Sequence, residues 1–306
     1  MEKITGYDVV LTFAPIEEIT GHVFEVFDYY LFLRDYCRVG MLFLGNMTRD
    51  KLKTAFESKY IDSFDDIQKD LIYYSLEDLK SKKIFMFDQD TRVLVADGNV
   101  HLLQTYDIKL LSRHLFGFLC FDNEMNLDEH NRSIYKNMVY LQDYRIYGRN
   151  LKFNSVDYVK KLPFSHYRRH ERTYDNTGMM YLTFHCRKIY PTTIMEYFIQ
   201  SGCDRCILVV PYKIPEYEGI DRNIIQVEAP LKNFFESFDT YIYTPIKRQF
   251  DCSSRLTTEC FMLGKKIYMD LPYVDIALQT RYSDCTSNLE SLNLKAGDGI
   301  LEILGL

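Results

Sequence analysis

Residues 241–266 read YIYTPIKRQFDCSSRLTTECFMLGKK, and this stretch decides the predicted fold. An apolar run comes first, followed by a polar loop, an amphipathic helix over 254–263 that Gly264 ends, and a further strand from Lys266. A strand, a helix and a second strand in this order form a unit that joins parallel strands of one sheet. The stretch therefore predicts an α/β protein.

The same alternation continues on both sides of this stretch. The second half predicts strands at 179–186, 206–210, 224–227, 240–243 and 266–269, with helices at 191–200 and 230–237. The first half predicts strands at 7–13, 39–44, 71–76, 84–87 and 93–96, and a helix over 48–60. After a loop over 14–21 it predicts a further helix, which begins around Thr20 to His22 and carries a wide apolar face from Val23 to Leu33. Pro191 at the first turn of its helix and Gly202 after its end stand where these residues are usually found.

Between residues 139 and 175 the periodicity becomes irregular and basic residues accumulate, which indicates an interdomain region. We therefore predict two Rossmann-like domains, 1–175 and 176–306, that face each other across a cleft. Ligands of such sheets bind beyond the carboxyl ends of the strands.

The loop before the helix over 254–263 predicts an anion site. Exposed N–H groups and the positive end of the helix dipole favour a diphosphate there, and Arg255 adds a planar fork of donors. Glu259, one turn further on, could accept hydrogen bonds from ribose hydroxyls. The predicted donor-binding residues of this segment are Thr244, Lys247, Arg248, Asp251, Ser253, Ser254, Arg255 and Glu259.

Each of these residues also has an ordinary structural interpretation. A serine before a helix is a common N-cap, and Gly264 is a common C-cap. Arg255 and Glu259 are four residues apart and could form a solvated salt bridge. Only the combination favours a binding site.

The segment FDCSSRLTTEC at 250–260, together with GHVFEVFDYY at 21–30, resembles phage-encoded glycosyltransferases of the GT-B fold that modify DNA bases. The resemblance implies two Rossmann-like domains, a UDP-sugar donor in the C-terminal domain, and 5-hydroxymethylcytosine in DNA as the acceptor. By the same resemblance, Arg187 and Lys188 would neutralise the diphosphate leaving group. The chain departs from the family's glycine-rich donor loops, so the position of the sugar is left open.

Two residues of the first half are candidates for a catalytic base. His22 stands at a strand-to-helix junction and has an ordinary pKa near neutrality, whereas Asp97 follows a strand in an Asp-Gly turn. The sequence does not choose between them, and a retaining reaction would need neither. A helix-start histidine and a simple turn are the structural alternatives. Asp275, Gln279 and Arg281 are candidates for reading sugar hydroxyls, or else surface residues.

The basic region offers a place for DNA. Arg145, Arg149, Arg168 and Arg169 could bind phosphates, and the tyrosines and phenylalanines between them could stack on an exposed base. A charged linker that packs its tyrosines is the alternative.

Composition limits the classes of protein to which the chain can belong. A net charge of −6 argues against a protein that coats nucleic acid through its overall field. The sequence shows neither a signal peptide nor a run long enough to span a bilayer, so we expect a cytoplasmic protein, in the host cell if phage-encoded, without membrane partners. Eight scattered cysteines predict free thiols, including the pair Cys203 and Cys206.

We therefore expect a hexosyl- or pentosyltransferase without a metal or other cofactor, because the one DxD-like spacing, Asp88 to Asp90, lies in the first half. The alternatives are a transferase for a polysaccharide or small-molecule acceptor, a phosphosugar epimerase-like enzyme, and a non-catalytic nucleotide-sugar-binding protein. The oligomeric state is left open.

Overall fold

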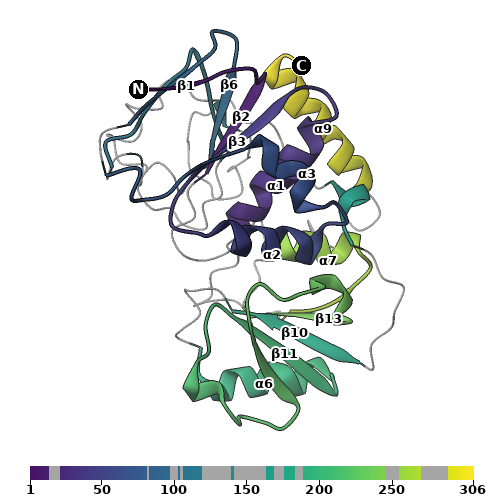
Figure 1. The fold of residues 1–306 in the computed structure, drawn as a ribbon. Coiled ribbons are helices and arrows are strands. Elements are labelled where there is room, and N and C mark those ends of the chain that lie inside the picture. Colours follow the sequence, from purple (N-terminus) through teal and green to yellow (C-terminus); the bar gives the residue numbers. More distant parts are fainter. Residues whose placement is uncertain are drawn as a thin grey trace, which may run out of the picture. The chain divides into compact units, whose positions relative to one another are not determined.

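The computed structural model describes residues 1–13, 21–80, 83–96, 103, 106–118, 139–140, 163–168, 176–182, 189–244, 255–269 and 289–306 (Figure 1). Contacts divide the chain into two compact units. Unit 1 comprises Met1–Thr48, Phe64–Pro163 and Glu290–Leu306, and unit 2 comprises Arg49–Ser63 and Phe164–Leu289. Both chain ends therefore belong to unit 1.

The main sheet of unit 1 has six strands in the order β4-β3-β2-β6-β8-β9, and every neighbouring pair is parallel. In chain order these strands are β2 (Val9–Phe13), β3 (Val39–Leu44), β4 (Leu71–Tyr74), β6 (Arg92–Ala96), β8 (His114–Phe118) and β9 (Val139–Tyr140). Counted along the chain, the order is therefore 3-2-1-4-5-6. Leu11 of β2 pairs with Met41 of β3 on one side and Leu94 of β6 on the other.

A second, three-stranded parallel sheet of unit 1 has the order β1-β5-β7 and packs against one face of the main sheet. Its strands are β1 (Glu2–Ile4), β5 (Ile84–Phe87) and β7 (Lys109–Leu111). The core between the sheets combines Val10, Leu42 and Val93 of the main sheet with Ile4 and Phe85 of the small one.

Helix α1 (Gly21–Leu33) contacts β2 and β3. The Phe27 ring of α1 lies 6.3 Å from that of Phe13, whose ring lies 5.0 Å from that of Phe43. These side chains alternate along the strands with Val10 and Leu42, so α1 covers the face of the main sheet opposite the small sheet. Other helices among the described residues of unit 1 are α3 (Phe64–Ile67), η1 (Gln68–Asp70) and, but for its first residue, α9 (Leu289–Leu304).

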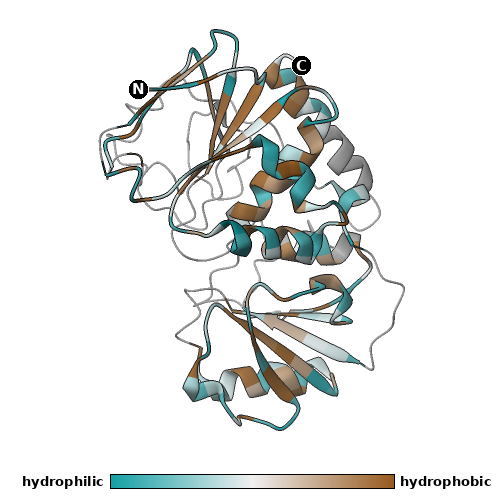
Figure 2. Cartoon of the chain, in the orientation of Figure 1, coloured by the Kyte–Doolittle hydropathy of each residue, from teal (hydrophilic) through white to brown (hydrophobic). Residues whose placement is uncertain are grey.

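Unit 2 is built on one five-stranded parallel sheet with the order β12-β11-β10-β13-β14. Its strands are β10 (Thr177–Tyr181), β11 (Arg205–Val210), β12 (Ile224–Glu228), β13 (Thr240–Tyr243) and β14 (Lys266–Met269). Counted along the chain, the order is 3-2-1-4-5. Figure 2 shows hydrophobic residues along strands of this sheet and along those of unit 1, as expected where both faces are covered.

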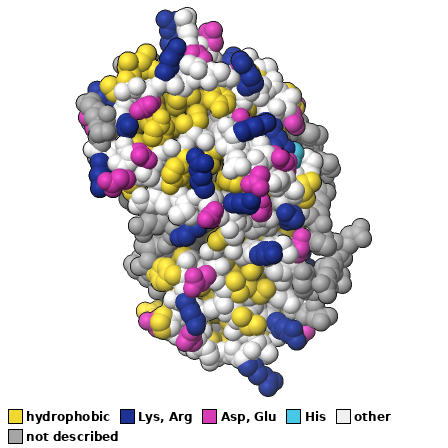
Figure 3. All heavy atoms as spheres, viewed as in Figure 1, with side chains coloured by type: hydrophobic (Ala, Val, Ile, Leu, Met, Phe, Trp, Pro, Cys, Tyr) yellow, Lys and Arg dark blue, Asp and Glu magenta, His cyan; other side chains and the backbone are white. Residues whose placement is uncertain are grey.

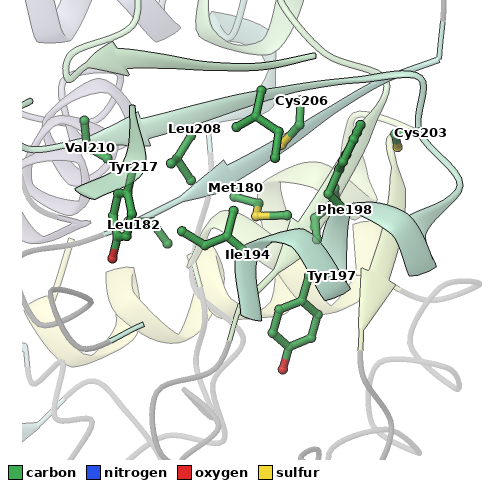
Figure 4. Close-up of a cluster of buried hydrophobic side chains, with 12 residues drawn as sticks. Met180, Leu182, Ile194, Tyr197, Phe198, Cys203, Cys206, Leu208, Val210 and Tyr217 are labelled. Carbon is green, nitrogen blue, oxygen red and sulfur yellow. The ribbon is translucent and has the colours of Figure 1, made fainter. Parts of the chain in front are cut away.

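Helix α6 (Pro191–Ser201) covers one face of the unit 2 sheet. Its Ile194 and Phe198 pack on Met180, Leu208 and neighbouring apolar residues (Figure 4). Gly202 ends the helix with a φ of 68°, in the left-handed region that glycine adopts readily. The opposite face lies toward α7 (Arg255–Met262), η6 (Phe234–Glu236) and α2 (Arg49–Lys59). Tyr181 alternates along β10 with Met180 and Leu182, so its side chain points to this opposite face. Its ring lies 5.9 Å from that of Phe234 in η6. The described part of unit 2 also contains the short turns η3 (Phe164–His166) and η5 (Pro215–Tyr217).

The two units depart from the predicted boundary at 175/176. Helix α2 and residues up to Ser63 belong to unit 2, although unit 1 precedes and follows them along the chain, and residues 290–306 return to unit 1. Helix α2 belongs to unit 2 because its buried face turns toward that unit, where its last residue, Lys59, contacts Glu259. The order of elements along the chain does not indicate that a helix from the first half belongs to the second unit.

The predicted α/β class is confirmed, with three sheets whose strands run parallel. The predicted strands at 39–44, 84–87, 240–243 and 266–269 match β3, β5, β13 and β14. The helix expected over 230–237 is only the short turn η6. No helix in the described ranges has the length and apolar character needed to cross a membrane.

Gly178, in the central strand β10, marks a close approach in the core of unit 2. An added Cβ would lie 2.7 Å from Cδ1 of Ile242 and 3.0 Å from Sγ of Cys203. Gly178→Ala should therefore lower the free energy of unfolding by about 1–3 kcal/mol, measured by urea denaturation. Gly21→Ala is the control, since an added Cβ there meets no atom within 4 Å. Equal stability of the two variants would contradict this packing.

Candidate functional site

The carboxyl ends of β10 and β13 are neighbours in the unit 2 sheet, and the chain leaves them in different directions. From β10 it continues through α6 to β11, and from β13 it continues through α7 to β14. Because α6 and α7 cover opposite faces, the two connections diverge between these strands. Ligands of parallel α/β sheets bind at such divergence points, beyond the carboxyl ends of the strands.

Helix α7 begins where the sequence predicted it. It spans Arg255–Met262, within one residue of the predicted 254–263 at each end, and Gly264 follows with a φ of 71°. Thr244, the first residue after β13, is buried. The predicted contacts Lys247, Arg248, Asp251, Ser253 and Ser254 lie outside the described residues, and of Arg255 only the helical backbone is described. Their donor-binding roles stay predictions.

Glu259 of α7 points into unit 2. Its side chain is 0% exposed, and its Oε2 lies 2.8 Å from Nζ of Lys59, the last residue of α2. The hydroxyl of Tyr167 donates to Oε1 at 3.2 Å. Since both carboxylate oxygens are held by protein groups, Glu259 has no surface through which to bind a ribose in this structure. The predicted ribose contact is therefore corrected to an internal ion pair.

Aromatic rings surround the Lys59–Glu259 pair. The Lys59 ammonium lies 4.9 Å from the ring centroid of Phe234 and 5.1 Å from that of Phe235. The Tyr167 ring lies 5.8 Å from that of Phe235. Burial, and then the Glu259 charge, raise the pKa of the adjacent Cys260 thiol well above its ordinary value. The pair therefore lies in an apolar setting, where ion pairs are stronger but costly to desolvate.

Residues 59–62 and 166–168 lie side by side in unit 2. Tyr60 and Tyr167 form an antiparallel bridge, and backbone hydrogen bonds join Ile61 N–H to His166 O at 2.8 Å and Arg168 N–H to Lys59 O at 2.8 Å. The rings of Tyr60 and Tyr167 stack with centroids 5.2 Å apart. This pairing places Tyr167 beside the end of α2.

Two side-chain contacts reinforce the same pairing. Nδ1 of His166 lies 2.8 Å from Oδ2 of Asp62. Nε of Arg168 donates to the carbonyl of Glu57 at 2.8 Å, near the carboxyl end of α2, where cations stabilise a helix. Arg168, predicted to bind DNA, thus contributes to holding α2. The other predicted DNA contacts, Arg145, Arg149 and Arg169, lie outside the described residues.

The remaining predicted residues are placed only in part. His22 is the second residue of α1, but its side chain is not among those described. Further predicted residues lie outside the described ranges, namely Asp97, Arg187, Lys188, Asp275, Gln279 and Arg281. The described structure therefore does not choose between His22 and Asp97 as a base.

The cysteines and acidic residues show no metal chemistry within the described residues. Cys203 and Cys206 are buried free thiols, and burial, with the neighbouring Cys203, raises the pKa of Cys206 to about 12. Such a thiol is a poor nucleophile. Oδ2 of Asp88 accepts a hydrogen bond from Gly6 N–H at 3.0 Å, so this member of the DxD-like pair holds a turn. No three His, Cys, Asp or Glu residues gather as metal ligands among the described positions.

Charge is mixed on the face shown in Figure 3. Blue and magenta side chains are interspersed there, without a region of one sign. The described residues on this face therefore give no extended basic surface for DNA.

Sequence reasoning missed Lys59 and Tyr167, the two partners of Glu259. A signal for Lys59 was present, because Leu52, Ala55 and Phe56 of α2 are buried and position 59 continues the same stripe. A lysine on the apolar face of a helix needs a buried partner. Tyr167 gave no comparable signal, since it stands in a region without periodicity.

Comparison with known proteins found no relative of this chain. No protein-family model matches the sequence, and no curated protein is significantly similar to it.

Proposed function

We propose that the chain is a glycosyltransferase that binds a UDP-sugar at the carboxyl edge of the unit 2 sheet. The main support is topological: the parallel sheets have the strand orders 3-2-1-4-5-6 in unit 1 and 3-2-1-4-5 in unit 2. The first is the order of dinucleotide-binding Rossmann folds, and the second lacks only the last strand. Two such sheets in one chain are what the GT-B resemblance of 250–260 and 21–30 requires.

The donor site proposed here combines α7 with the loop before it. The first turn of α7 presents N–H groups that no residue of the helix accepts, and these favour a diphosphate. Thr244 directly follows β13 at the same edge, and Arg255 is the first residue of the helix. Lys247, Arg248, Ser253 and Ser254, in the intervening loop, supply the charge and hydroxyl groups that the phosphates need. Arg187 and Lys188 follow β10, the neighbouring strand, and would stabilise the departing UDP.

The reaction proposed is transfer to an acceptor hydroxyl. The hydroxyl oxygen forms a bond to the anomeric carbon of the sugar, the bond from that carbon to the phosphate oxygen breaks, and UDP leaves with the negative charge. In an inverting reaction His22 or Asp97 takes the hydroxyl proton. The preferred acceptor is 5-hydroxymethylcytosine in DNA, which rests on the resemblance, and a polysaccharide or small-molecule acceptor is the alternative.

Binding of UDP tests the donor site. A ligand present at 100 times its dissociation constant stabilises the folded protein by about 2.7 kcal/mol. We therefore expect UDP to raise the thermal midpoint by a few degrees, and ADP and NAD to leave it unchanged. A midpoint that does not respond to UDP would contradict the proposal.

Turnover separates the enzyme from a binding protein. UDP-glucose mixed with DNA that contains 5-hydroxymethylcytosine should yield UDP and a glycosylated base, whereas unmodified DNA should not. UDP binding without sugar transfer to this DNA, a polysaccharide or a small-molecule alcohol would indicate a non-catalytic nucleotide-sugar-binding protein.

A further inference from the structure

Helix α7 is too short to hold its own position. It has eight residues, whereas isolated helices need about 12–15 residues to be even marginally stable in water. Its placement must therefore come from tertiary contacts. Glu259, the fifth of its eight residues, carries the ion pair to Lys59 across a separation of 200 residues in sequence.

The contacts at Glu259 fix both the rotation of α7 about its axis and its position along that axis. One carboxylate oxygen receives the Lys59 ammonium at 2.8 Å and the other receives the Tyr167 hydroxyl at 3.2 Å. Hydrogen bonds are directional, so two of them to the two oxygens of one carboxylate restrict rotation of the helix about its axis as well as sliding along it. Apolar packing alone restrains neither as tightly.

The groups that hold Glu259 are themselves held. Lys59 ends α2, whose buried residues Leu52 and Phe56 seat that helix in unit 2. Tyr167 is held by the bridge and ring stack with Tyr60, the residue after Lys59. Both partners of Glu259 therefore come from two backbone segments that are hydrogen-bonded to each other.

We propose that Lys59, Tyr167 and Glu259 are positioning residues that aim the amino end of α7 at the donor diphosphate. This inference rests on the proposed function, because it assigns the cluster a role in donor binding through α7. In this role Glu259 supports donor binding indirectly, in place of the direct contact with the ribose that the sequence predicted. A misplacement of about 1 Å that is caused by a change far from the reacting atoms can cost about 100-fold in rate, so residues that only hold α7 can still affect what its amino end does.

Lys59→Met is the variant that separates positioning from direct binding. If the cluster aims α7, UDP affinity falls by about tenfold or more, Lys59→Arg keeps most of it, and Glu259→Gln falls like Lys59→Met. If Glu259 binds the ribose directly, Glu259→Gln loses affinity while Lys59→Met, which releases the carboxylate, does not. That second pattern would overturn the proposal.

Because Lys59→Met leaves a buried charge and risks unfolding, the double variant Lys59→Met with Glu259→Leu is the second measurement. It removes both charges, and similar replacements of buried ion pairs often retain stability. The proposal expects a folded protein with weakened UDP binding and faster hydrogen exchange of the α7 amides. Unchanged UDP affinity in this variant would show that the cluster is structural only.

A matched control lies on the same helix. Lys53 and Glu57 of α2 form a partly exposed pair with Nζ and Oε1 3.9 Å apart, so Lys53→Met with Glu57→Leu removes equal charges and leaves Lys59, Tyr167 and Glu259 in place. This control should bind UDP as the wild type does. Hydrogen exchange of α7 is read without ligand, so it tests the anchor separately from UDP binding. A wild type that does not bind UDP contradicts the proposed function, whereas unchanged α7 exchange in the double variant contradicts the anchor itself.

Discussion

Replacing Lys59 by methionine is expected to lower the free energy of unfolding of unit 2 by about 3–5 kcal/mol, the usual cost of breaking a buried ion pair by removing one partner. Lys59 has a side chain only 6% exposed, and Glu259 is fully buried. Without the ammonium, the carboxylate stays buried in an apolar setting with no opposite charge beside it, which costs free energy. Urea denaturation, followed by circular dichroism, measures the loss.

The control for this prediction is Lys53→Met, because Lys53 belongs to a partly exposed pair on the same helix, with side chains 40% and 34% exposed. Exposed ion pairs contribute about 0–1 kcal/mol, so this variant should unfold close to the wild type. The double variant of Lys59 and Glu259 should recover most of the loss from Lys59→Met alone. A loss below about 1 kcal/mol for Lys59→Met would mean that the pair is not buried in solution.

Long buried strands could be predicted from the sequence because their patterns are strong. β3 is buried at all six positions and β13 at all four, and both appear as continuous apolar runs. β1 and β7 have three residues each, too few for a period to emerge. The small sheet they form with β5 was therefore not predicted.

The C-terminal helix α9 was missed for a different reason. Its interior contains Gly297 and Gly299, and each glycine disfavours a helix by about 1 kcal/mol relative to alanine. Its place is set by tertiary contacts instead. Ile300 and Leu304, one turn apart, are buried, and the Arg92 guanidinium donates to the carbonyl of Gly305 at 3.1 Å, next to the end of the helix.

The strand and the helix beside the candidate site were predictable from the sequence, but the orientation of the Glu259 side chain was not. The strand, loop and helix over 240–263 fix where α7 begins, and this came from local pattern alone. Which face of α7 is buried depends on α2, which lies about 200 residues earlier in the chain and belongs to the same unit. Spacing four residues apart put Glu259 and Arg255 on one face, but it did not say that position 259 meets a buried lysine.

Phe43→Ala is expected to lower the free energy of unfolding of unit 1 by about 3–5 kcal/mol, the range for a large aromatic side chain removed from a packed core. Phe43 is fully buried in β3, with its ring 5.0 Å from that of Phe13 and stacked on Tyr73 at 4.8 Å. The loss combines transfer of the ring to water with a cavity between β3 and α1 that the strands cannot close. Hydrogen exchange of amides in β2 and β3 reports the change within this unit.

Tyr36→Ala is the control, because that ring is 58% exposed and its removal should change stability by less than about 0.5 kcal/mol. Equal exchange in the two variants would show that the face of the main sheet toward α1 is not the packed core described here.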